Sequence, residues 1–583
     1  MSSRRGALAL GALLLLGCTP AAATGQQAAP GVALPTAPPA AEPASIPPGR
    51  VPPTGDPALG WDILHYDIEI ALPTGPGWIA GRTTIQALRT APAGSLALDL
   101  VGLAVTDVRV DRRVVGIDQR EGKLIVATGG GRAGDTLQVE ITYAGTPDDG
   151  LVLQQTTGGK PSAFVDNWPD RARFWFPSVD HPADKATASY TVHAPAAWQV
   201  IANGAPVGPA VRTAAGTGGP AGDRRTWRWR TDVPIPTYTM VIGATELAVD
   251  TVGTAACGNA PAAAGRDRCV EVTTWLYAED RAKAAPSFAR SARMVQLMSE
   301  WIGPFPYEKL AHVQSSTRFG GMENAAAIFY DEKGIAAGRN IEGTVAHETA
   351  HQWFGDSVTE AEWRHLWLSE GFATYFGALF YEWADGTAAF RSEMSQERRG
   401  YLGSAVVDRP VIDPEADDLF GLLNANNYQK GAWVLHMLRG VVGDSAFQAG
   451  IRAYYDKHKN GTALTADLRT AMERASGADL RWFFGQWLEQ PGHPILRVTP
   501  TFEATNGQVV VMIEQIQRAS WPRFRTPLTL VARGPWGERR LDVELTGART
   551  LARFPADAPA DSVTVDPDGW VLLTVEGEAA GAR

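Results

Sequence analysis

Apolar and polar residues alternate in several short stretches of the first half of the chain. Residues 66–72, 83–88 and 136–143 follow this alternation, which has the period of a half-buried β-strand. Clusters of Gly, Pro and Asp separate the stretches, as turns between strands do. The pattern predicts a β-rich domain built on a large antiparallel sheet over residues 57–248.

The period changes after about residue 280. Apolar residues then recur at helical spacing, which predicts helices at 281–301, 341–355, 362–383, 426–442 and 465–475. A strand is predicted at 310–314, and a β pattern returns between 495 and 575, with strands at 509–513 and 528–531. Because 583 residues are too many for one core, we expect a multidomain α+β protein. Its second and third domains would span 249–492 and 493–577.

The first residues have the form of an export signal. A basic start that includes Arg4 and Arg5 precedes a short apolar run, residues 6–17, which is too short to span a membrane. The run ends in Leu15-Leu16-Gly17-Cys18, which resembles a bacterial lipobox and predicts a lipoprotein-type signal peptide over 1–18, lipidated at Cys18. The alternative is a secretory signal cleaved near residues 21–24.

Residues 19–56 are rich in Pro and Ala, which predicts a disordered linker. With the lipobox, this predicts an exported protein, periplasmic or at the cell surface, held to a membrane by a lipid anchor. A secreted protein is the alternative, and the two arginines leave Sec and twin-arginine export both open.

The cysteines and the net charge indicate which covalent bonds and which partners to expect. Cys257 and Cys269 lie close together in the sequence, and in an exported chain such a pair predicts a disulfide, whereas in a cytosolic chain both would be free thiols. The formal net charge is -10 and no long Lys/Arg run is present, so we expect no nucleic-acid partner. The oligomeric state is left open.

The strongest chemical signal is His347-Glu348-Thr349-Ala350-His351, followed by Glu370. Positions i and i+4 lie on one face of a helix, so His347 and His351 can bind one metal ion, and Glu370 can add a carboxylate. Two His and one Glu form the ligand set of a catalytic zinc that keeps one position open for water. Glu348 is placed to take a proton from that water. The sequence therefore predicts one Zn²⁺ per chain.

Further motifs surround this one. Phe319-Gly320-Gly321-Met322-Glu323-Asn324-Ala325 lies upstream, and its two glycines allow the backbone to approach a ligand closely. Together with 345–356, 367–373, 428–432 and 171–182, the set resembles the aminopeptidase N family, the gluzincin zinc aminopeptidases that include the leukotriene-hydrolysing enzyme. Ser369 stands where the family more commonly has Asn.

The resemblance implies a β-rich N-terminal domain, a thermolysin-like catalytic domain and a C-terminal β-sandwich, and the chain ends where larger members add a helical domain. It implies that the enzyme cleaves the N-terminal residue from peptides with a free N-terminus. Tyr428 would stabilise the oxyanion and Glu323 would bind the substrate ammonium. Gly320, Gly321, Met322 and Asn324 would line the substrate.

The family often adds a second amine-binding residue from the N-terminal domain. Trp168 stands at the matching position, and the neighbouring Asp166 or Asn167 could replace it, or no residue does. A thermolysin-type endopeptidase, an epoxide hydrolase and a non-catalytic peptide-binding lipoprotein are the alternative functions. An endopeptidase would not need Glu323.

Overall fold

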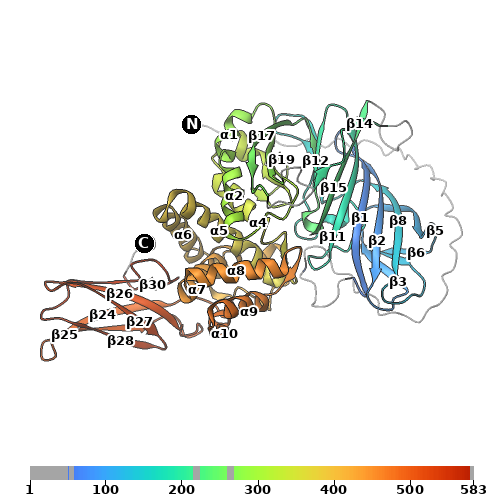
Figure 1. Ribbon diagram of the computed structural model, residues 1–583. Helices are drawn as coiled ribbons and strands as arrows, with labels where there is room; N and C mark the ends of the chain where they lie inside the picture. Colours follow the sequence, from blue (N-terminus) through green and yellow to red (C-terminus); the bar gives the residue numbers. More distant parts are fainter. Residues whose placement is uncertain (1–49, 51–57, 214–222, 259–267, 578–583) are drawn as a thin grey trace, which may run out of the picture. The chain divides into compact units, whose positions relative to one another are not determined.

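The computed structural model describes residues 50, 58–213, 223–258 and 268–577 (Figure 1). The predicted signal peptide with Cys18, and most of the predicted linker, lie outside these residues. In the part of the chain that the structure describes, no helix is long and apolar enough to span a membrane.

The three alternating stretches lie in β1 (Trp61–Ala71), β2 (Ile79–Arg89) and β8 (Thr136–Gly145). They belong to a nine-stranded sheet of order β13-β15-β11-β1-β2-β8-β4-β5, with β14 paired to β15. Its other strands are β4 (Ala104–Val110), β5 (Arg113–Val114), β11 (Lys185–Pro195), β13 (Ala205–Pro206), β14 (Val211–Arg212) and β15 (Arg224–Pro236). The expected antiparallel arrangement is wrong at one place, because β1 pairs in parallel with β11. Alternation along a strand identifies its buried face and says nothing of the direction of its partner.

Two smaller sheets complete the β-rich N-terminal region. One has the order β12-β16-β10-β9 and the other the order β3-β7-β6. Their strands are β12 (Gln199–Ala202), β16 (Ile242–Thr245), β10 (Pro161–Val165), β9 (Leu151–Gln155), β3 (Ser95–Asp99), β7 (Lys123–Ala127) and β6 (Ile117–Arg120). The segment after β10 carries Trp168.

The middle region contains a five-stranded sheet of order β17-β18-β19-β21-β20 and most of the helices in the described residues. The strands are β17 (Ala248–Ala255), β18 (Val270–Leu276), β19 (Leu310–Ser315), β21 (Ala327–Asp331) and β20 (Gly321–Met322). The helices are α1 (Arg281–Phe288), α2 (Ser291–Trp301), α3 (Glu332–Ala336), α4 (Glu342–His351), α5 (Trp367–Asp385), α6 (Thr387–Leu402), α7 (Gly431–Val442), α8 (Asp444–His458), α9 (Thr465–Ser476) and α10 (Arg481–Leu488). A two-stranded sheet pairs β22 (Val358–Glu360) with β23 (Gly461–Ala463).

Several predicted helix boundaries are corrected by the structure. The segment 281–301 forms two helices, α1 and α2, and apolar spacing misses the break because both bury their apolar side chains in the same core. Helix α4 ends at His351, short of the predicted end at 355, where Gly355 takes a positive φ of 117° that a right-handed helix excludes. Residues 426–430 form a π-helical turn before α7.

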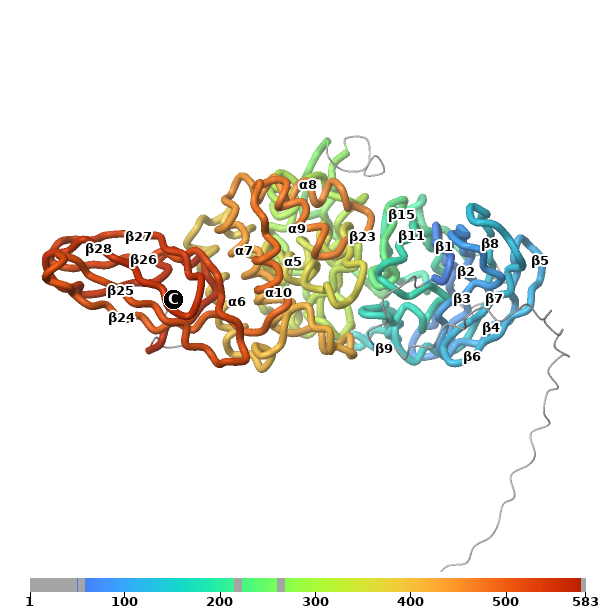
Figure 2. Tube along the Cα trace, turned by 90° about the horizontal axis from the view of Figure 1, so that it is seen from below, coloured from blue at the N-terminus to red at the C-terminus, as the bar shows by residue number. Residues whose placement is uncertain are grey.

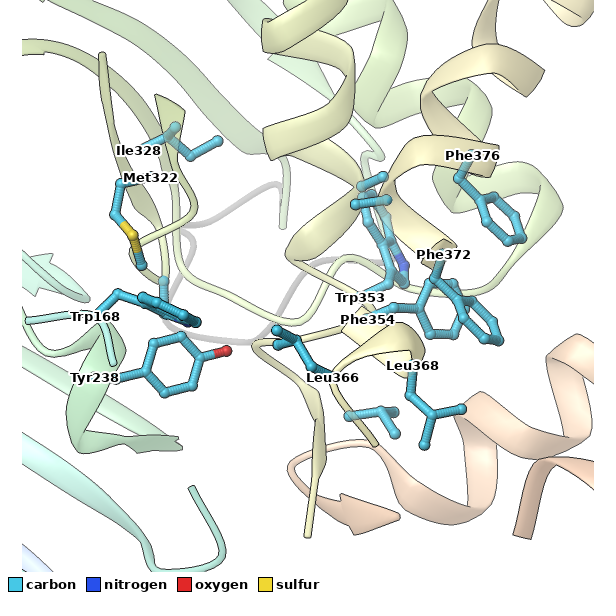
Figure 3. Close-up of a cluster of buried hydrophobic side chains, with 14 of the residues drawn as sticks. Trp168, Tyr238, Met322, Ile328, Trp353, Phe354, Leu366, Leu368, Phe372 and Phe376 are labelled. Carbon is cyan, nitrogen blue, oxygen red and sulfur yellow. The ribbon is translucent and has the colours of Figure 1, made fainter. Parts of the chain in front are cut away.

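A cluster of aromatic side chains fixes helix α4 against helix α5. Phe354, just after α4, lies with its ring centroid 4.4 Å from that of Phe372 on α5 and 5.2 Å from that of Phe376. Figure 3 shows these rings together with Trp353, and all four side chains are buried. Tight packing of this kind holds two helices at one separation, so the polar residues on their facing sides keep a fixed geometry.

The C-terminal region is made of two sheets, of order β28-β25-β24-β30 and β27-β26-β29, whose strands run along one another in Figure 2. The strands are β24 (Ile495–Glu503), β25 (Gln508–Gln515), β26 (Thr526–Gly534), β27 (Gly537–Leu545), β28 (Arg549–Pro555), β29 (Ser562–Val565) and β30 (Thr574–Val575). On β25 every second side chain is buried, from Val509 to Ile513.

The two cysteines of the middle region are paired. The Sγ atoms of Cys257 and Cys269 lie 2.01 Å apart, which is a disulfide bond. The bond closes the short connection between β17 and β18, as the sequence spacing predicts.

Candidate metal centre

Helix α4 and helix α5 bring three metal-ligating groups together. The Nε2 atoms of His347 and His351 lie 3.0 Å apart, because the two residues are one helical turn apart on the same face. Oε2 of Glu370, on α5, lies 3.3 Å from each of these nitrogens. The predicted ligands therefore converge on one point.

The three groups fit a metal ion of the size and preference of zinc. Bonds of about 2.0–2.1 Å in a tetrahedron place neighbouring ligand atoms roughly 3.3 Å apart, which matches the separations found here. Glu370 is 4% exposed and its Oε2 has no hydrogen-bond partner among the described residues. A buried carboxylate oxygen without a partner is costly, and a cation at this point removes that cost.

Neighbouring oxygens orient the two imidazole rings. Nδ1 of His351 lies 3.1 Å from the carbonyl oxygen of Phe354 and 3.1 Å from the hydroxyl of Ser369. Nδ1 of His347 lies 3.5 Å from the hydroxyl of Thr374. A proton held on Nδ1 by a carbonyl leaves the Nε2 lone pair free for a metal. The sequence predicted the ligands and did not predict these supporting residues.

Glu348 lies directly against the glycine pair upstream. A Cβ placed on Gly321 would lie 2.2 Å from Oε1 of Glu348 and 2.6 Å from its carboxyl carbon. Only glycine leaves room for the carboxylate at this position. Burial raises the pKa of Glu348, and the nearby carboxylates of Glu323 and Glu370 raise it further. A raised pKa suits a group that must accept a proton and hold it.

Glu323 follows the edge strand β20 and is held by the zinc-motif helix. The side-chain Nε2 of Gln352 donates to the carbonyl oxygen of Glu323 over 2.8 Å, and its Oε1 accepts from the backbone N–H of Ala326 over 2.8 Å. The carboxylates of Glu323 and Glu348 and a ring nitrogen of His351 lie within 4.8 Å of one another. Burial raises the pKa of Glu323. Gln352 is a positioning residue that the sequence analysis did not identify.

Tyr428 approaches the metal ligands from the π-helical turn. Its hydroxyl donates to Oε1 of Glu370 over 2.8 Å, and its ring lies nearly parallel to that of His347, with centroids 5.9 Å apart. Glycines allow this approach, because a Cβ on Gly371 would lie 2.9 Å from backbone atoms of Gly431. The close contact brings the turn that carries Tyr428 against α5.

These residues surround a cavity of about 220 Å³. Its lining residues are Trp168, Phe319, Gly320, Gly321, Met322, Glu323, His347, Glu348, His351, Glu370, Leu423 and Tyr428. Of the predicted substrate-lining residues, Asn324 is fully buried and is not part of the wall, and neither atom of its side-chain amide has a hydrogen-bond partner among the described residues. The others line the cavity as expected for a binding site.

Of Trp168, which stands at the matching position, and the two candidate anchors Asp166 and Asn167, Trp168 alone lines the cavity. Asp166 is buried and forms ion pairs with Arg171 at 2.7 Å and with Arg318 at 3.0 Å. Asn167 accepts from the indole N–H of Trp175 and donates to the carbonyl oxygens of Thr237 and Met240. Both polar side chains are therefore engaged in contacts within the protein.

Comparison with known families agrees with this geometry. Residues 287–487 match the model of the peptidase family M1 domain, and residues 63–239 match that of the peptidase M1 N-terminal domain. The two ranges together cover more than half of the chain.

Curated relatives and solved structures point the same way. The chain is 27% identical to tricorn protease-interacting factor F2 of Thermoplasma acidophilum, over 75% of this chain and 54% of that protein. It is 37% identical to aminopeptidase N of Lactococcus lactis, over 30% of this chain and 23% of that protein. The chain thus spans about half, or less, of the length of these relatives.

The crystal structure of an M1 zinc metallopeptidase from Deinococcus radiodurans superposes with a TM-score of 0.63 and 27% identity, covering 73% of this chain and 93% of that one. A mutant of that enzyme bound to a Tyr-Ser-Ala substrate superposes with a TM-score of 0.64 and 26% identity, covering 74% and 94%.

Proposed function

This chain belongs to the peptidase M1 family, and on that basis we propose that it is a zinc-dependent aminopeptidase that removes the N-terminal residue from peptides. The observation that carries the proposal is the position of Glu323. Its carboxylate lies within 4.8 Å of a carboxylate oxygen of Glu348 and a ring nitrogen of the metal ligand His351. Consecutive Cα atoms are about 3.8 Å apart, so an ammonium held by Glu323 leaves room for one residue before the scissile carbonyl.

The residues of the chain divide the chemistry between them. A bound zinc ion polarises a carbonyl and lowers the pKa of a water to about 7. Glu348 accepts the proton of the attacking water and passes it to the leaving amine. The hydroxyl of Tyr428, whose one proton goes to Oε1 of Glu370 in this structure, would turn to the oxygen on which negative charge develops and donate to it, a contact that is strongest in the transition state.

An assay with blocked and free substrates tests the function. The full chain, loaded with zinc, is given aminoacyl reporter amides with a free amine and the same compounds acetylated on that amine. We expect hydrolysis of the free-amine compounds and little of the acetylated ones. Equal cleavage of acetylated internal peptides would favour a thermolysin-type endopeptidase instead.

We also propose that the protein is exported and anchored in a membrane by lipid on Cys18, on the strength of the sequence Leu15 to Cys18. A disulfide between Cys257 and Cys269 is consistent with an oxidising compartment. Mass spectrometry of the mature protein tests this: the proposal expects an acylated N-terminal Cys18, and an unacylated start well beyond it would mean simple secretion.

For the architecture we propose a thermolysin-like catalytic domain over 249–492 and a β-sandwich over 493–577. The sandwich is supported by rows of buried side chains on both C-terminal sheets. One row includes Val509 and Val511 on β25, and the other includes Leu528 and Leu530 on β26. Two sheets that each bury one face stabilise one another by packing those faces together.

A further inference from the structure

Trp168 is held rigidly in the wall of the cavity. Its side chain is 2% exposed, and its ring meets three other rings edge to face: Phe319 at 6.0 Å, Trp363 at 5.8 Å and Phe420 at 5.6 Å between centroids. Its carbonyl oxygen accepts from Nε of Arg171 over 2.7 Å. Contacts from three separate segments hold the indole in one orientation.

The polar residues of the cavity wall already have parts in the proposed reaction. They comprise the metal ligands, the base, the oxyanion donor and the ammonium-binding carboxylate. The remaining side chains that line the cavity are Trp168, Phe319, Met322 and Leu423. Figure 3 shows Met322 directed toward Trp168. The part of the wall that is free to contact a substrate side chain is therefore apolar.

The charges around the cavity disfavour an acidic side chain there. Glu323, Glu348 and Glu370 line it, and no Lys or Arg of the described residues does. Of the nearby cations, Arg318 is occupied by Asp149 and Asp166. An acidic first residue would meet carboxylates with no Lys or Arg side chain of the described residues in the cavity wall to pair with it, which costs free energy in a partly desolvated site.

We propose that Trp168, together with Phe319 and Leu423, binds the side chain of the substrate's first residue and selects large apolar residues, aromatic ones included. This inference rests on the proposed aminopeptidase function and names its substrate class. Trp168 would then contribute selectivity for the side chain, and Glu323 would hold the ammonium.

Kinetics on a set of substrates tests the proposal. The wild-type chain with zinc is given Phe, Leu, Ala, Arg and Asp para-nitroanilides, and the ratio of kcat/KM for Phe to that for Ala is measured. Burying a large apolar side chain corresponds to a ratio of at least about ten, and Asp should be the poorest substrate. Trp168→Ala should lower the Phe-to-Ala ratio about tenfold, Trp168→Phe should lower it less, and Leu423→Ala should lower it independently.

A matched control distinguishes the effect of changing the cavity wall from a general effect of removing an indole side chain. Trp78 lies in the same region of the chain with 55% exposure and does not line the cavity, so Trp78→Ala should keep the wild-type ratio. The ratio is measured within each variant, so a smaller folded fraction does not change it. An unchanged ratio in both Trp168→Ala and Leu423→Ala, or a wild type that prefers Ala or Asp, would overturn the inference.

Binding measurements distinguish failure of this inference from failure of the proposed function. Calorimetry on the Glu348→Gln variant compares L-phenylalanine amide with L-alanine amide, without turnover. If the wild type hydrolyses no free-amine substrate, the aminopeptidase proposal fails. A preference for the phenylalanine amide that is lost in the Glu348→Gln/Trp168→Ala double variant would still support selection by Trp168. Equal binding of both amides by the Glu348→Gln variant would refute it.

Discussion

The hydroxyl of Tyr428 donates a 2.8 Å hydrogen bond to Oε1 of Glu370, the carboxylate whose Oε2 faces both histidines. One phenol thus supports a metal ligand from the side and also borders the cavity. A second contact to a metal ligand orients it and tunes its affinity. Because the phenol has one proton, Tyr428 donates to Glu370 before the reaction and would donate to the oxyanion during it, so its removal should affect the metal and the reaction separately.

Replacing Tyr428 with Phe should reveal both effects. Loss of an oxyanion donor should lower kcat by about a hundredfold or more, and loss of the bond to Glu370 should weaken zinc binding by roughly 10–100-fold. Steady-state kinetics at saturating zinc isolates the first effect, and a zinc titration against a chelator isolates the second. Normal kcat at saturating zinc would remove Tyr428 from the reaction.

Removing the metal should abolish activity and destabilise the fold. Without a cation, the buried Oε2 of Glu370 has no hydrogen-bond partner among the described residues. Zinc that binds this site in the native state only should therefore raise the melting temperature. Activity and melting temperature are measured after chelation and after adding back zinc, with metal content confirmed by elemental analysis. Full activity of metal-free protein would contradict the assignment of the centre.

Changing Glu348 to Gln keeps the shape of the side chain and removes the base. Glu348 is adjacent to the ligand His347 and outside the triad of ligands, so zinc should stay bound while turnover falls at least about a hundredfold. Turnover and zinc content are measured on the same preparation. Near-normal turnover would show that another group moves the proton.

Gly321 offers a test of how tightly the base is packed. In Gly321→Ala the new methyl group would lie 2.2 Å from Oε1 of Glu348, so the carboxylate must move. Misplacement of a catalytic group by about 1 Å can lower the rate by about a hundredfold, so kcat should fall at least about tenfold with zinc retained. At Gly320 a Cβ meets nothing within 4 Å, so kcat should fall less in Gly320→Ala than in Gly321→Ala. Equal losses in the two variants would show that the contact with Glu348 is not the cause.

The sequence predicted the metal centre because its geometry is local. The spacing of His347 and His351 on one helix determines where their side chains point. The helix that carries Glu370 was also predicted, although it begins at Trp367 rather than at 362. Local periodicity therefore located the ligands even where a helix boundary was wrong.

Contacts between distant segments were beyond reach of the same reasoning. Trp168 meets Phe319, Trp363 and Phe420 only in the folded chain, and no periodic pattern marks it as a wall of the cavity. The parallel pairing of β1 with β11 likewise joins residues more than a hundred positions apart. Helices α3, α6, α8 and α10 were not predicted.

The role of Glu323 decides between an exopeptidase and an endopeptidase. A buried carboxylate that binds an ammonium forms a charge-assisted hydrogen bond of about 1.5–3 kcal/mol, and removing it leaves the desolvated cation without a partner. Glu323→Ala should therefore lower kcat/KM for free-amine substrates at least about tenfold, since roughly 1.4 kcal/mol corresponds to a factor of ten. The measurement is kcat/KM for matched free and acetylated substrates.

The acetylated substrate serves as the internal control, because it cannot present the ammonium. The wild type should cleave the acetylated substrate poorly, and Glu323→Ala should lower kcat/KM for this substrate little further. Glu323→Gln, which keeps the size of the side chain and removes its charge, separates loss of the ion pair from a cavity left by truncation. Both variants must retain zinc, since Glu323 lies within 4.8 Å of a ring nitrogen of His351. If both variants affect free and acetylated substrates alike while zinc is retained, Glu323 does not bind the amine, and the thermolysin-type reaction becomes the better description of the site.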